Sequence, residues 1–239
     1  MDGAVMRSLL LSLALLPLAG CAQLSPPSVL TQQTRDWRQA VTDSDRARLR
    51  GWRMAFVEGL RQARAAGHGA EIDREGALLR PDAALGGGIP NGTYRCRVTK
   101  LGAKNEGLLP YIAYPAFTCR IKAERDLQGF AKLSGSQRQV GLVFPNDQLR
   151  SVFLGTLILG DESRAMQYGA DPERDLAGYV ERIGDNRWRL ILPYPRFESL
   201  IDVVELNPGL DADSRTARTA ARLIDLAVRQ HLAAAPSGV

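Results

Sequence analysis

Two cysteines in nearly repeated segments are the residues of this chain whose spacing first suggests chemistry. Cys96 lies in "YRCRV" and Cys119 in "FTCRI", about twenty residues further along. Zinc sites usually combine a CxxC spacing with nearby histidines, and the chain has neither the spacing nor more than two histidines. A redox-active pair usually shows the same CxxC spacing. A disulfide or two buried thiols are then the main alternatives, with the disulfide expected in an oxidising compartment.

Three arginines flank these cysteines. Arg95, Arg97 and Arg120 alternate with the apolar residues, so we expect them on the face opposite the thiols. On adjacent strands they could clamp a phosphate or a carboxylate. The alternative is a solvated outer face whose charges pair with carboxylates such as Glu106 or Glu124. The pattern favours the solvated face and keeps the three arginines as candidate ligand-binding residues.

The segment "SGSQRQVG" (134–141) concentrates small polar residues in a turn. Ser136 could act as a nucleophile, with Gln137 and Arg138 as hydrogen-bond donors to a substrate. However, the GxSxG elbow is missing, and no histidine lies nearby in sequence. A turn that satisfies its own backbone is therefore favoured, with Gln137 and Arg138 kept as candidate binding residues. Catalytic residues stay unassigned.

Carboxylates offer a second route to chemistry. Glu71 and Glu75 are four residues apart on a predicted helix and share one face, and Glu205 stands near the end of the strand region. Such acids can serve general acid–base catalysis or bind Ca²⁺, but no EF-hand spacing is present. A solvated helix face is the default interpretation. The sequence predicts no metal site and no cofactor.

The N-terminus indicates where the protein resides. A basic residue, a short apolar run and "LAGC" (18–21) form a secretory signal that resembles the bacterial lipobox. We therefore expect residues 1–20 to be removed, Cys21 to be lipidated, and residues 21–34 to form a tether. Ala22 follows the cysteine, which favours the periplasmic face of the outer membrane. An oxidising compartment makes a Cys96–Cys119 disulfide the favoured pairing.

The formal net charge is +5. In the envelope, a basic protein could contact anionic lipid or an envelope protein, although arginine bias in a GC-rich genome also explains the charge. Nucleic-acid binding would need a basic stripe with interleaved aromatic residues, and an envelope location argues against it. The expected partner is the membrane, through the anchor, and an envelope protein or anionic lipid is a further candidate.

Helical and strand patterns divide the mature chain. Residues 35–88 predict a helical cap, with one helix over 35–67 and a second over 69–79. Residues 89–208 predict an antiparallel β domain, and 209–239 a C-terminal helix and tail. The expected strands are 92–98, 114–121, 127–133, 138–144, 151–159, 177–183, 188–194 and 200–206.

This order predicts an α+β, mainly β fold. Seven or eight short strands with tight links favour a small antiparallel barrel or a curled sheet, because closure removes exposed edges. Trp52, Tyr179, Trp188 and Tyr194 are expected in or near the core, where they either pack together or line a ligand cavity.

With these segments in view, the chain resembles a family of uncharacterised bacterial lipoproteins, the domain of unknown function 4893. The resemblance covers about residues 35–208 and includes "DRARLRGWRMAF", "GSQRQVG", "DPERDLAGYVERIG" and "RWRLILPYPRFES". It implies a shared fold and compartment and no particular activity.

We therefore expect a lipid-anchored envelope protein that binds a ligand or partner, and we favour this interpretation over an enzyme. One alternative is a hydrolase or transferase acting on an envelope glycan or peptide through Ser136, Glu71 or Glu205. Another is a structural component of an outer-membrane complex that assembles through the C-terminal helix.

Overall fold

The computed structural model describes residues 34–209. The predicted cap consists of helices α1 (Trp37–Ala40), α2 (Asp43–Ala65) and α3 (Gly69–Glu75) and the 3₁₀ turn η1 (Gly76–Leu79). The predicted 35–67 helix is interrupted before Asp43, because Thr42 is extended and its hydroxyl caps α2. The 69–79 helix changes to a 3₁₀ turn at Gly76, which has φ +57°. No helix within residues 34–209 is long and apolar enough to cross a bilayer.

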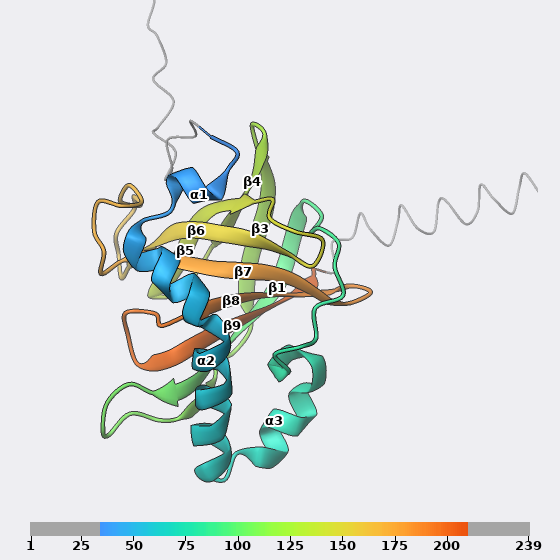
Figure 1. The fold of residues 1–239 in the computed structure, drawn as a ribbon, viewed down its shortest axis with the longest axis vertical. Coiled ribbons are helices and arrows are strands. Elements are labelled where there is room, and N and C mark those ends of the chain that lie inside the picture. The colour runs from blue at the N-terminus through green and yellow to red at the C-terminus, as the bar shows by residue number, and fades with distance from the viewer. Residues whose placement is uncertain (1–33, 210–239) are drawn as a thin grey trace, which may run out of the picture.

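The sheet closes into an antiparallel barrel of eight strands, with β2 added at its side, which confirms the predicted fold class (Figure 1). The chain runs from each strand to its neighbour in the barrel, and β9 returns to pair with β1. The strands are β1 (Gly92–Ala103), β2 (Tyr111–Ala113), β3 (Phe117–Glu124), β4 (Leu127–Lys132), β5 (Gln137–Phe144), β6 (Arg150–Leu159), β7 (Asp175–Gly184), β8 (Arg187–Pro193) and β9 (Ser199–Pro208).

Strand β1 allows the closure because it is twelve residues long. Its first half pairs with β3 on one edge, and most of its length pairs with β9 on the other. Glycine also permits tight curvature: Gly141 and Gly155 face each other across β5 and β6, and a methyl group on either would collide with the opposite backbone. The strand predicted at 92–98 is shorter than β1, which continues to Ala103, and β2 was not predicted.

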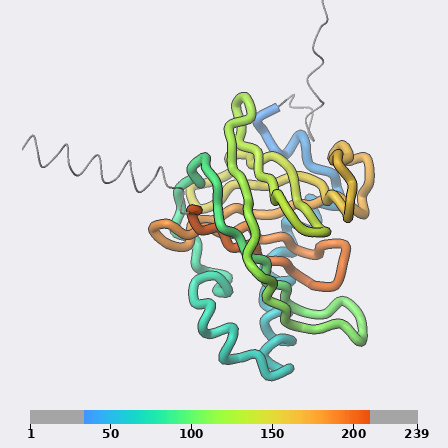
Figure 2. The backbone as a smooth tube through the Cα atoms, turned by 180° about the vertical axis from the view of Figure 1, so that it is seen from behind, coloured from blue at the N-terminus to red at the C-terminus, as the bar shows by residue number. Residues whose placement is uncertain are grey.

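Apolar side chains occupy both faces of the barrel wall. The interior holds one core, which includes Tyr94, Phe130, Phe153 and Trp188. Outside, α2 lies across β1, β7, β8 and β9 (Figures 1 and 2). The outer core includes Trp52, Phe56, Leu101, Ile191 and Val203. The helical cap thus buries its apolar stripe against the barrel.

Cys96 and Cys119 lie on the neighbouring antiparallel strands β1 and β3, with both side chains fully buried in the barrel interior. Their Cα atoms are 5.9 Å apart, within the range that a disulfide requires. The prediction that both thiols share the interior face is confirmed, and the two cysteines form a disulfide-capable pair.

A fully buried arginine joins the helical cap to the barrel. Arg189 of β8 donates to Glu181 of β7 at 2.9 and 2.6 Å, on the outer face of the sheet. Its third nitrogen donates to the backbone carbonyls of Ala77, Leu78 and Arg80 at 3.1, 2.8 and 2.7 Å. These carbonyls belong to η1 and the residue after it, where the chain needs partners for carbonyls that no longer form helical bonds.

Removing this guanidinium should destabilise the protein severely. Arg189→Met leaves Glu181 buried without its main partner, so we expect the free energy of unfolding to fall by about 3–5 kcal/mol. Denaturant unfolding would measure the change.

The matched control is Arg61→Met on the exposed side of α2, where the solvent-screened pair with Glu58 should contribute little to stability. The double change Arg189→Met with Glu181→Met should recover part of the loss, because the fully buried carboxylate is removed together with its main partner, although Arg150 then loses its contact with Glu181. Equal effects of Arg189→Met and Arg61→Met would contradict the assignment.

Candidate functional site

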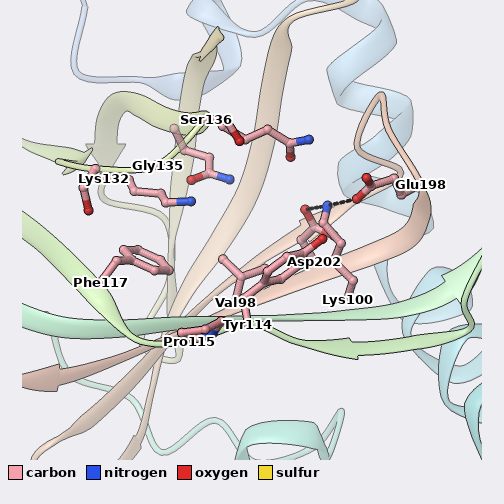
Figure 3. A pocket seen from close by; sticks show the side chains of 13 residues that line it. Val98, Lys100, Tyr114, Pro115, Phe117, Lys132, Gly135, Ser136, Glu198 and Asp202 are labelled. Carbon is pink, nitrogen blue, oxygen red and sulfur yellow. Dashed lines mark hydrogen bonds and ion pairs between the residues drawn. The ribbon is translucent and has the colours of Figure 1, made fainter. Parts of the chain in front are cut away.

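One end of the barrel interior is polar. Interior positions alternate along each strand, and most carry apolar side chains. At this end the same alternation places Lys100 on β1, Lys132 on β4, Gln137 and Gln139 on β5, and Asp202 on β9. These side chains line a cavity of about 310 Å³, which we call the mouth cavity (Figure 3).

The rest of the mouth cavity divides into an apolar wall and a polar rim. The apolar wall is formed by Val98, Tyr114, Pro115 and Phe117. The rim is formed by Ser134, Gly135, Ser136 and Glu198. A small cavity with an apolar wall and a few convergent polar groups is typical of ligand-binding sites in proteins.

One wall carries a buried ion pair. Lys100 and Asp202 are register partners on β1 and β9, and the Lys100 Nζ lies 2.9 Å from Asp202 Oδ2. Glu198 Oε2 lies 3.4 Å from the same nitrogen, and the Ser199 hydroxyl donates to Asp202. Burial alone would lower the pKa of Lys100, but the carboxylates of Asp202 and Glu198 outweigh burial and raise it. Lys100 therefore stays protonated, and the carboxylates beside it balance its positive charge fully.

Lys132 differs from Lys100, because within residues 34–209 it has no ion-pair or hydrogen-bond partner. Its Nζ lies 4.4 Å from the centroid of the Phe117 ring, a cation–π contact. Figure 3 shows its side chain extending from the wall opposite Lys100, Asp202 and Glu198. Burial lowers the pKa of Lys132, and the like charge of Lys100 lowers it further. An anion placed beside this ammonium would offset both effects.

Gln139 is the second polar group without a partner. Its side chain is 3% exposed, and its Oε1 has no hydrogen-bond partner among the described residues. Buried polar atoms in proteins are nearly always paired, so an orphan beside a cavity points to a missing donor. A hydroxyl or amino group of a ligand would supply that donor.

The structure separates the residues that the sequence analysis had grouped as candidates. Gln137 lines the mouth cavity, whereas the Arg138 guanidinium donates to the backbone carbonyl of Glu162 outside it. Arg95 and Arg120 are exposed on the outer face of β1 and β3. These side chains do not converge with Gln137 on one ligand site.

Arg97 is already occupied by protein carboxylates. It forms a bidentate pair with Glu75 at 2.6 and 2.5 Å and contacts Glu205 at 2.9 Å. Burial opposes ionisation of Glu205, but the hydrogen bond from Arg97 and the charge of Arg187 keep its pKa below the usual range. These partners connect α3 to the barrel and differ from Glu106 and Glu124, which the sequence analysis considered.

The residues considered for catalysis lie apart. Ser136 lies on the rim of the mouth cavity, but its hydroxyl has no histidine or carboxylate partner within residues 34–209. His68 stacks on Tyr111 with ring centroids 4.9 Å apart and lies 3.6 Å from Glu71. No group of three or more potential metal ligands occurs in the described part of the chain. Cys21 and the C-terminal helix lie outside the described residues.

A second buried polar cluster lies outside the barrel and connects α2 to the loop before β7. Tyr168 donates to Asp45 at 2.6 Å, and Arg48 lies 2.9 Å from the same carboxylate. Both carboxylate oxygens of Asp175 accept from the amide of Gly169, at 3.0 and 3.1 Å. These contacts join α2 to the loop before β7, so we assign the cluster a role in packing.

The mouth cavity was not anticipated from the sequence, although a signal was present. Lys100, Lys132 and Asp202 occupy positions that continue the inward alternation of Val98, Phe130 and Val204. Burying a charged residue at an inward position of a strand costs free energy, so such residues indicate either an ion pair or a functional site. The aromatic residues of the cavity are Tyr114 and Phe117, whereas the sequence analysis had considered Trp52, Tyr179, Trp188 and Tyr194.

The fold and the cavity define a small closed antiparallel barrel with a polar, partly buried chamber at one end. The chain belongs to the family described as "Domain of unknown function (DUF4893)", whose profile matches residues 37–206. A segment of 34 residues is 65% identical to the formimidoylglutamase of Nocardia farcinica. This segment is 14% of the chain and 11% of that protein, so the chain spans about a tenth of the relative's length. No solved structure matches the chain.

The second cluster predicts a pH-dependent stability. Burial raises the pKa of Asp175 from 3.8 to about 6, and the neighbouring Asp45 adds to the shift. The folded state then binds a proton more tightly than the unfolded state, so the free energy of unfolding should fall as pH rises from about 4 to 6. Asp175→Asn should remove this contribution and therefore gain stability relative to the original protein across that window.

Chemical denaturation of both proteins between pH 4 and pH 7 would test this expectation. Asp43→Asn is the control, because Asp43 is fully exposed on α2. If the stability curve of Asp175→Asn runs parallel to that of the original protein, the titration of Asp175 is not coupled to folding.

Proposed function

We propose that this protein is a lipid-anchored binding protein of the cell envelope, and that the mouth cavity holds its ligand. The observation that carries this proposal is one cavity in which the Lys132 ammonium and the buried Gln139 Oε1 have no hydrogen-bond or ion-pair partner among residues 34–209. A protein gains nothing in stability from burying such groups unpaired, because each loses its hydration. A ligand that pairs with them would restore the lost interactions.

The anchor is proposed from the lipobox at residues 18–21. A diacylglyceryl Cys21 carrying a further acyl chain would hold the protein at a bilayer firmly, whereas one acyl chain binds only marginally. Residues 22–33 would then separate the bilayer from the barrel, on the periplasmic face of the outer membrane. Because the chain carries a net positive charge, we propose an envelope protein or anionic lipid as a further partner.

Binding is favoured over hydrolysis or group transfer by the positions of the acids and the serine. Glu205 is neutralised by Arg97 and Arg187, and Glu71 lies near His68 at the helical cap. Ser136 shares the cavity with neither of them. A nucleophilic mechanism needs a base within hydrogen-bond reach of the nucleophile, and no histidine or carboxylate of residues 34–209 is hydrogen-bonded to Ser136.

The anchor predicts a specific chemical product. Protein extracted from the membrane of its own host should begin at Cys21 and carry the mass of a diacylglyceryl group plus an acyl chain. Alkylation of the unfolded protein without reductant should leave Cys96 and Cys119 unmodified, and alkylation of the unfolded protein after reduction should label both.

Cys21→Ser is the control and should abolish the lipid mass without changing the alkylation pattern. A mature N-terminus elsewhere, or an unmodified Cys21, would overturn the anchor. Labelling of Cys96 and Cys119 before reduction would overturn the oxidised pair.

The ligand site predicts retention of a small molecule. The mature chain with Cys21→Ser, incubated with the low-mass fraction of an envelope extract, should retain a compound visible by native mass spectrometry. Lys132→Met removes the ammonium at nearly constant length and should lose that compound.

Lys122→Met is the matched control, because Lys122 lies on β3 with its ammonium exposed and paired to Glu124. It should retain the compound as the original protein does. If no compound is retained, or if all three proteins retain it equally, the mouth cavity is not the binding site.

A further inference from the structure

The mouth cavity is electrically asymmetric, and we infer that its ligand is a small zwitterion of amino-acid or short-peptide size, with a free carboxylate and a free amino group. This inference rests on the proposed function, because it names the ligand class of the same cavity. It follows from the charges on the two opposed walls, the neutral surface between them and the volume enclosed.

The positive side is Lys132. Its ammonium has no carboxylate of the described chain to neutralise it and lies against the face of Phe117. Gly135 lies beside it, since a Cβ at that position would come within 3.5 Å of the Lys132 Nζ. Because Gly135 carries no side chain, the approach to the ammonium stays open. A ligand carboxylate could form a charge-assisted hydrogen bond there.

The opposite side carries one carboxylate in excess. Asp202 already neutralises Lys100 and accepts from Ser199, so Glu198 adds a second negative charge to a single ammonium. Figure 3 shows these groups together on the wall away from Lys132. The Glu198 Oε2 beside Lys100 is buried, but 38% of the side chain is exposed, so a ligand cation would approach the other carboxylate oxygen. An amino group placed here would restore the balance of charge.

The backbone of Glu198 supports this role. Its φ is +68°, in the left-handed region that glycine adopts at lower cost. The Glu198 carbonyl accepts from the Lys104 amide at 2.9 Å, which holds this conformation. Non-glycine residues held in this region tend to occur where a side chain has a task.

The surface between the two walls fits the middle of such a ligand. Phe117, Val98 and Pro115 offer apolar contact, and Gln139 offers an unpaired carbonyl oxygen to a ligand N–H. A volume of about 310 Å³ lies at the lower end of the range for ligand pockets, which suits an amino acid or dipeptide better than a long chain. A simple anion would use Lys132 but leave the Glu198 side without a counter-charge.

A panel of dipeptides in four charge forms would test the inference by isothermal titration calorimetry at neutral pH. Each dipeptide is used free, N-acetylated, C-amidated and doubly blocked, which gives a zwitterion, an anion, a cation and a neutral molecule of nearly one shape. At least one free dipeptide should bind, and blocking either end should weaken it roughly tenfold or more.

The variants assign each end of the ligand to a wall. Lys132→Met should make the free and amidated forms bind equally, because the carboxylate has lost its partner. Glu198→Gln should make the free and acetylated forms bind equally. Lys122→Met, which removes the same charge from the outer face, should leave all four affinities unchanged, and unfolding midpoints would verify that each variant is folded.

Three results overturn the inference. They are no binding of any dipeptide, equal binding of free and blocked forms, and tight binding of the acetylated anion with no effect of Glu198→Gln. If the mature chain still retains an envelope compound through Lys132 in any of these cases, the proposed binding function stands with another ligand class. If no compound is retained either, both the inference and the proposed function fail.

Discussion

The pairing of β1 with β9 is the constraint on which the rest of the structure depends. It runs from Tyr94 opposite Pro208 to Ala103 opposite Ser199 and turns an open sheet into a barrel. Closure gives every strand one face toward the barrel interior and one toward the outside. Side chains that alternate along a strand therefore point alternately into the barrel and away from it. The same register sets Lys100 opposite Asp202, and the mouth cavity is built around that pair.

Two cations, Arg189 fully buried and Lys132 partly buried, show how a structural charge differs from one at the candidate site. Arg189, outside the barrel, meets a carboxylate and three carbonyls, so its loss of hydration is compensated completely. Lys132, inside the mouth, meets an aromatic face and no carboxylate of residues 34–209. Both burials cost free energy, but only the first is balanced within the described part of the chain. The incomplete set of partners therefore identifies the site better than the presence of charge does.

Periodicity was enough to predict the barrel, because each strand alternates over several residues and the links between strands are short. Periodicity was not enough to predict the residues of the candidate site. Arg97 resembles Arg95 in sequence, yet only Arg97 reaches Glu75 and Glu205, because Glu205 is its register partner on β9 and Glu75 at the end of α3 lies within hydrogen-bond distance. The cavity depends on residues from β1, β4, β5 and β9 that meet only after closure. Local patterns place a residue on a face, whereas pairing between distant strands decides its neighbours.

The cysteine pair connects the barrel to the proposed compartment. Cys96 lies in register with Phe117, and Val98 follows two residues later on the same inward face. Both Phe117 and Val98 belong to the apolar wall of the mouth cavity, so a bond between Cys96 and Cys119 ties β1 to β3 directly beside that wall. Such a bond persists only where the surroundings are oxidising. An anchored envelope location would thus supply the redox conditions under which the wall facing the ligand is covalently braced.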